Sequence, residues 1–120
     1  MAVSNIPVLT AAALHVDSDA ANAAVAVKAS SAVLYELEMD NTANGAASYL
    51  KLWNTAAASV TVGTTAPDMV IMVPASVSRT LVVPSGLTFG TALSYAAVTT
   101  AGTAGTTSPT SDFAIKLVYV

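Results

Sequence analysis

The chain has little charge, one histidine, few aromatic residues and no cysteine. Charged residues are 9% of its 120 residues, whereas an average soluble domain has roughly 25%. The absence of cysteine excludes a disulfide framework and a thiolate metal site. The four cations stand singly along the chain, so no basic stripe can neutralise phosphates, and nucleic acid is not an expected partner. They are Lys28, Lys51, Arg79 and Lys116.

Long apolar runs are also missing. No charged residue lies between Thr80 and Ser111, but Pro84, Gly86 and Gly90 interrupt that segment. No stretch reaches the roughly 20 apolar residues of a membrane-spanning helix. The N-terminus lacks the basic region and continuous apolar segment of a signal peptide. We therefore expect synthesis in the cytoplasm and no membrane partner.

Residues that could carry out catalysis are sparse. The one histidine, His15, lies in an Ala-rich segment, and no second feature supports a Ser-His-Asp arrangement. Glu36 and Glu38 lie about 7 Å apart on a predicted strand, a separation that could serve a glycosidase. Seven aromatic residues are too few to line a sugar groove, so we interpret the two glutamates as a solvated strand face.

Ligand-binding motifs are incomplete. The segment 17–22 resembles a calcium loop but lacks its glycine and its closing glutamate. Asp40, Asn41 and Asn44 could bind calcium weakly, although a plain turn is the interpretation we prefer. Gly102 and Gly105 are not followed by the lysine of a phosphate-binding loop. We expect no enzyme activity, cofactor, metal or small-molecule substrate.

Small side chains dominate what is present, with 25 alanines and 16 valines. So few charges leave much of the surface neutral, and such a surface is typical of a protein partly covered by other protein. The alternative is a monomer coated with serine and threonine.

A two-residue alternation begins near residue 25 and predicts β-strands. In the segment 32–40 it places one set of side chains toward the core, namely Val33, Tyr35, Leu37 and Met39. It places the other set outward, namely Leu34, Glu36, Glu38 and Asp40. The turn-forming segment 41–45 and the alternating segment 48–53 then predict a hairpin. Its predicted pairs are Leu37–Leu50, Tyr35–Leu52 and Glu36–Lys51.

Further short strands are predicted after this hairpin. They cover 59–62, 69–73 (with both faces covered), 77–83, 87–89, 93–98 and 112–120, with a turn at 83–87 and a loop at 99–111. Eight or nine short strands without a long helix are typical of an all-β fold. We predict an antiparallel β-sandwich over residues 25–120, jelly-roll-like with about eight strands, after an irregular N-terminal arm at 1–24.

This register makes an outward apolar patch of Leu34, Tyr49 and Trp53, which a neighbouring chain could cover. In the alternative, Trp53 belongs to the core. The small polar residues of the 99–111 loop suit a contact loop, and we expect Thr103, Thr106 and Thr107 to belong to the same protein interface.

Four short segments carry a resemblance to a known class of protein. YLKLW (49–53), VGTTAP (62–67), MVIMVP (69–74) and PSGLTFGTALSYAAVT (84–99) resemble small β-rich structural proteins of tailed bacteriophages. The resemblance covers roughly the last 75 residues and does not include the first 30.

The resemblance implies a virion protein without catalysis. Its size and fold suit a capsid decoration, or cement, protein, made in the host cytoplasm and located on the capsid surface. Such proteins form homotrimers that bind the major capsid protein lattice and stabilise the shell. The alternative is a tail, baseplate or fibre component involved in host attachment. A bacterial carbohydrate-binding module is a third possibility.

Overall fold

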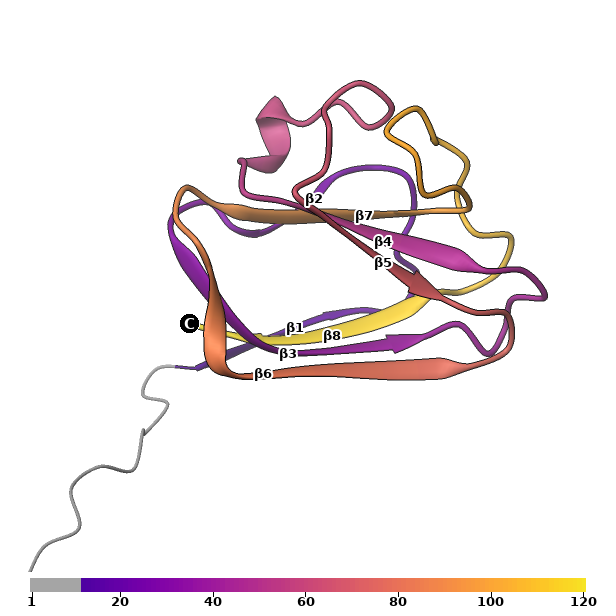
Figure 1. The fold of residues 1–120 in the computed structure, drawn as a ribbon, viewed down its shortest axis with the longest axis horizontal. Helices are drawn as coiled ribbons and strands as arrows, with labels where there is room; N and C mark the ends of the chain where they lie inside the picture. The colour runs from indigo at the N-terminus through magenta and orange to yellow at the C-terminus, as the bar shows by residue number, and fades with distance from the viewer. Residues whose placement is uncertain (1–11) are drawn as a thin grey trace, which may run out of the picture.

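The chain folds into two antiparallel four-stranded sheets that pack face to face, as Figure 1 shows. The computed structural model describes residues 12–120. Sheet A has the strand order β1-β8-β3-β6, and sheet B has the order β2-β7-β4-β5. The strands are β1 (Ala13–Asp17), β2 (Val25–Lys28), β3 (Ala32–Asp40), β4 (Ser48–Trp53), β5 (Met69–Val73), β6 (Ser78–Phe89), β7 (Leu93–Val98) and β8 (Ala114–Tyr119), with a short 3-10 helix, η1 (Ala57–Ser59).

The predicted all-β sandwich is therefore confirmed, while its jelly-roll connectivity stays a prediction. The core lies between the sheets, because alternate residues of most strands point inward and are apolar. Sheet A contributes Leu37, Met39, Ile115 and Leu117, and sheet B contributes Leu50, Leu52, Leu93 and Tyr95, all of them buried.

The predicted boundary between an arm at 1–24 and the sandwich is wrong. Residues Ala13–Asp17 form β1, an edge strand of sheet A that pairs antiparallel with β8. The sequence did not indicate this strand, because its polarity is reversed. The inward positions hold Ala13, His15 and Asp17, whereas the outward positions hold Leu14 and Val16. Residues 1–11, the first part of the predicted arm, lie outside the described residues.

The predicted hairpin between residues 32–40 and 48–53 is also wrong, although both strands exist. β3 lies in sheet A and β4 in sheet B, so their inner faces oppose each other. Leu37 pairs with Leu81 and Leu117, whereas Leu50 pairs with Ile71 and Ala97. A hairpin and two facing strands both bury every second residue, so alternation alone does not distinguish them.

A bulge in β3 explains the burial of Leu34. Against β8, β3 has one extra residue, Tyr35, because Leu34 pairs with Tyr119 and Glu36 pairs with the next residue, Val118. Against β6 the pairing is also irregular, since β6 has four residues where β3 has Tyr35 alone. Such an irregularity bends the strands and changes which face the following side chains occupy. Leu34 therefore points inward, and so does Leu37 beyond the bulge. In Figure 1, the start of β3 and the end of β6 bend together away from the rest of sheet A.

Gly86 makes this bend possible. Its φ is +79°, and a Cβ there would overlap the Val33 side chain and lie 3.0 Å from Tyr35 Cε1. Glycine adopts such a conformation without penalty, whereas other residues do not.

We expect Gly86→Ala to lower the free energy of unfolding by about 2 kcal/mol, because alanine is strained at positive φ and crowded by its neighbours. Urea unfolding measures the change. Gly45→Ala is the control, because no atom lies within 4 Å of the Cβ position at Gly45. Equal stability of Gly86→Ala and wild type would contradict this account of the bend.

Three smaller predictions differ from the structure. Residues 59–62 are not a strand, because η1 and a turn occupy this region. The predicted turn at 83–87 is instead part of the continuous strand β6, bent at Gly86. β5 is an edge strand whose Val70 and Met72 are exposed, so only one of its faces is covered by the sandwich.

Candidate functional site

The outer face of sheet B is covered by the chain's own loops. Figure 1 shows η1 and the loops that follow β4 and β7 lying over this sheet. Trp53 is 1% exposed and its Nε1 donates a hydrogen bond to the Thr65 carbonyl at 3.1 Å. Ser94 Oγ donates to the Thr55 carbonyl at 2.7 Å. The predicted outward patch is therefore wrong, since Trp53 lies under a loop and Leu34, 0% exposed, lies in the core.

Lys51 is buried on the same covered face. Its Nζ donates hydrogen bonds to three main-chain carbonyls of the 99–111 loop, at 2.7 Å to Gly102, 3.1 Å to Gly105 and 3.5 Å to Thr103. Burial lowers the pKa of this amine because it disfavours the charged form. The ammonium thus fastens the loop onto sheet B, and the predicted pairing of Lys51 with Glu36 does not occur.

The other predicted interface residues remain at the surface but do not form one patch with Leu34 and Trp53. Thr106 and Thr107 are exposed on the loop, and Thr103 is half-buried there. Tyr49 is half-buried on the outer face of sheet B, where it pairs with Met72 of β5. Their role in a protein interface stays a prediction.

The outer face of sheet A carries three strongly exposed apolar side chains. Leu14 is 62% exposed, Val16 is 56% exposed and Val82 is 59% exposed. Strand register places Leu14, Val118, Glu36 and Val82 in one row across the four strands, and Val16, Lys116, Glu38 and Thr80 in the next. These eight residues, with Asp40 and Ser78, form what we call the sheet A face.

Charge on the sheet A face is concentrated on its third strand, β3. Glu36, Glu38 and Asp40 occupy successive outward positions, and Lys116 lies directly across from Glu38. Hydrogen bonds from the Thr42 hydroxyl, the Thr42 amide and the Ser78 hydroxyl hold the pKa of Asp40 below its ordinary value. The shared face that we predicted for Glu36 and Glu38 is confirmed.

A hydrogen-bonded cluster joins the edge of sheet A to sheet B. Tyr95 Oη donates to Asp17 Oδ2 at 2.6 Å and lies 2.9 Å from His15 Nε2. A phenol has one hydrogen, and a carboxylate can only accept, so His15 Nε2 must donate to the phenol oxygen. The rings of His15 and Tyr95 also meet edge to face, with centroids 5.4 Å apart. The cluster therefore fastens β1 to β7.

Burial, followed by the hydrogen bond to Asp17, raises the pKa of Tyr95 far above its ordinary value. Above about pH 10 the unfolded chain loses the phenol proton and the folded chain keeps it, so stability falls with rising pH. We expect the fall to approach about 1.4 kcal/mol per pH unit from this group. Urea unfolding of wild type and Tyr95→Phe at a series of pH values above 9 measures it.

The phenylalanine variant lacks the ionising group and should lose less stability with pH, although it starts about 1–3 kcal/mol lower because Asp17 and His15 lose their partner. Absorbance at 295 nm gives a second test in the folded proteins. The increase between pH 8 and 11 should be the same in both, and a larger increase in wild type would refute the assignment.

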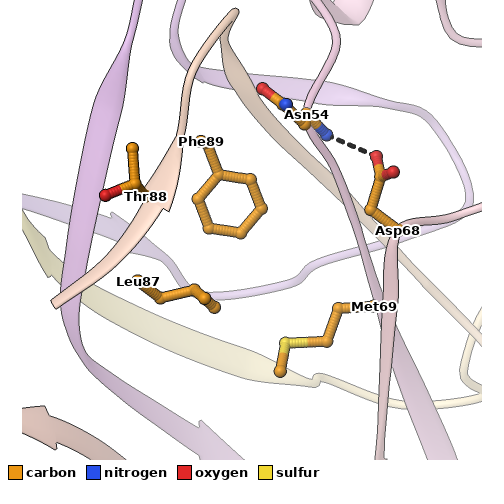
Figure 2. A pocket seen from close by; sticks show the side chains of 6 residues that line it. All are labelled: Asn54, Asp68, Met69, Leu87, Thr88 and Phe89. Carbon is orange, nitrogen blue, oxygen red and sulfur yellow. Dashed lines mark hydrogen bonds between the residues drawn. The ribbon is translucent and has the colours of Figure 1, made fainter.

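The open edge between β5 and β6 contains two adjoining hollows that share Met69. One, of about 240 Å³, is shown in Figure 2, where Met69, Leu87 and Phe89 point into the same space. The other, of about 350 Å³, lies toward Arg79. The polar groups at the two ends are already engaged. Asp68 Oδ2 accepts a hydrogen bond from the main-chain N–H of Asn54 at 2.7 Å, and Arg79 Nη1 donates to the Met72 carbonyl at 2.7 Å.

The asparagines considered for calcium binding are used within the fold. Asn41 Nδ2 donates to the Val73 and Pro74 carbonyls, and Asn44 Nδ2 donates to the Ser111 and Asp112 carbonyls. Over residues 12–120, no group of three or more His, Asp or Glu side chains is placed to hold a metal ion. Within the same range, no helix has the length and apolar character needed to cross a membrane.

Comparison of the chain with family models, with curated proteins and with solved structures gave no match. The geometry therefore carries the functional argument. The sheet A face was missed by sequence reasoning because two of its apolar residues, Leu14 and Val16, belong to the segment predicted as an arm. The alternation within ALHVD was the available signal.

Proposed function

We propose that this chain is a non-enzymatic virion structural protein, a capsid decoration protein that binds the major capsid protein lattice and stabilises the shell as a homotrimer. The observation that carries the proposal is the sheet A face. Leu14, Val16 and Val82 are more than half exposed there, whereas the chain covers the opposite sheet with its own loops. Strongly exposed apolar side chains that share one sheet face are typical of a protein–protein contact.

Two further features support this proposal. We propose a jelly-roll connectivity because every chain connection except β4–β5 crosses from one sheet to the other. The resemblance to phage structural proteins, in residues 49–53, 62–67, 69–74 and 84–99, suggests the class of particle. Fold alone does not carry the function, so the proposal depends on a binding experiment.

The experiment uses shells that are assembled without this chain from the major capsid protein of the phage to which the proposal assigns it. We expect the purified protein to co-sediment with these shells at a fixed stoichiometry and to raise the temperature at which they rupture. In purified virions its copy number should approach that of the major capsid protein. A few tens of copies, with binding to the host surface, would instead support the tail or fibre alternative. Shells that neither bind the protein nor gain heat resistance would refute the decoration role.

A further inference from the structure

Glu36 sits in an unusual position on the sheet A face. Its neighbours directly across the sheet are Val118 on β8 and Val82 on β6, and Leu14 lies beyond Val118 in the same row. The Glu36 side chain is half-buried among these apolar groups. A partner that covers the valines and the leucine would also remove water from the Glu36 carboxylate.

Removing water from an unpaired carboxylate is strongly unfavourable, whereas a carboxylate that gains a cation and hydrogen bonds is tolerated. A partner that places apolar groups over this row must therefore also place a cation opposite Glu36. The neighbouring row adds Glu38, whose partner across the strands is Lys116, and the next adds Asp40, which hydrogen bonds keep ionised. β3 thus presents three carboxylates on the sheet A face, whereas Lys116 provides the one ammonium group of that face.

A second copy of this chain is a poor occupant for the face. Two sheet A faces brought together would bring six carboxylates and two ammonium groups into one interface. The chain's other three cations do not lie on this face. Lys28 is on β2 in sheet B, and Lys51, also in sheet B, is enclosed by loop carbonyls. Arg79 donates to Met72 at the β5–β6 edge. Like charges across an interface disfavour binding, so the sheet A face suits a foreign partner.

We propose that the sheet A face binds a surface of the major capsid protein that is both apolar and basic, with a Lys or Arg side chain set against Glu36. This inference rests on the decoration function proposed above and adds the partner's chemistry to it. It also leaves the contacts within the trimer to other surfaces of the chain.

The test measures the affinity of decoration-free shells for wild type, Glu36→Gln, Glu36→Lys and Asp19→Asn. Asp19 is exposed and lies after β1, outside the sheet A face, so Asp19→Asn is the matched control for loss of one negative charge. We expect Glu36→Gln to weaken binding about 30-fold, as loss of one partner of a desolvated charge pair does, and Glu36→Lys to weaken it further. Asp19→Asn should stay within about twofold of wild type, because charges at the rim contribute little affinity.

Thermal unfolding of each variant establishes that it is folded, and sedimentation velocity measures self-association. If wild type binds the shells and both Glu36 variants bind equally well, the inference fails and the decoration function stands. If Glu36→Gln strengthens self-association and leaves shell binding unchanged, the occupant is a second copy and the inference also fails. If wild type does not bind the shells at all, the decoration function fails, and the assigned partner fails with it.

Discussion

Replacing Asn41 with alanine is expected to lower the free energy of unfolding by about 3 kcal/mol or more. Asn41 is 0% exposed and lies just after β3, where the chain leaves sheet A for sheet B. Its Nδ2 donates to the carbonyls of Ala46, Val73 and Pro74 at 3.0–3.2 Å, and its Oδ1 accepts from Ser48 Oγ at 2.8 Å.

The alanine variant would leave these buried groups without partners, and each buried group left unsatisfied costs about 1–3 kcal/mol. Urea unfolding measures the loss. Asn22→Ala is the matched control, because Asn22 is exposed and its Nδ2 makes one hydrogen bond, to Thr106 at 2.7 Å. We expect that control to lose about 1 kcal/mol or less. A loss no larger in Asn41→Ala than in Asn22→Ala would mean that Asn41 does not hold the crossing in place.

Replacing Lys51 with methionine is expected to cost about 2–3 kcal/mol, although methionine keeps most of the apolar stem. The substitution removes the one donor that the Gly102, Thr103 and Gly105 carbonyls share. Apolar replacement of a buried ion pair can be neutral, but here the acceptors are main-chain atoms that remain in place. Hydrogen exchange at the Gly105 amide, which bonds to Gly102, should become faster.

The pH dependence gives this prediction a second measurement. The folded-state pKa of Lys51 is lowered, so between that pKa and about 10.4 the unfolded chain binds more protons than the folded chain. The stability of wild type should therefore rise with pH in that window relative to Lys51→Met. Tyr95 acts in both proteins and cancels in the comparison. Lys28→Met is the control for loss of a lysine outside this cluster, and it should show neither the faster exchange nor the altered pH dependence.

Strand positions were readable from the sequence where polar and apolar residues alternate. The segments 32–40 and 48–53 alternate in this way, the segment 93–98 does so in part, and all three are strands. Partner choice was not readable, because β3 and β4 show the same alternation in facing sheets as they would in a hairpin. Asn41 and Asn44 help to set the partners, because their side chains hold the segment between β3 and β4 to the end of β5 and to the residues just before β8. No local sequence pattern indicates these hydrogen bonds.

Burial was harder to predict than secondary structure. The irregular pairing at Tyr35 involves three extra residues in β6, nearly fifty positions away, so the local sequence around Leu34 does not indicate it. Trp53 and Lys51 do point outward from sheet B, as expected, but loops of small residues cover them. The sheet A face went unnoticed because β1 has its polar residues, His15 and Asp17, on the inward side.

Lys51 binds its loop through main-chain atoms, so side chains of the loop can be substituted without loss of these hydrogen bonds. The ammonium contacts main-chain oxygens, which every amino acid supplies, and no side chain of residues 102–105 takes part in these bonds. Gly105 is restricted because a Cβ there would overlap Thr100, and the Thr106 side chain packs closely against Gly63. Within residues 12–120, no such close contact involves the exposed side chain of Thr107. The tip can therefore acquire new surface chemistry, by drift or by engineering, while the anchor beneath it stays the same.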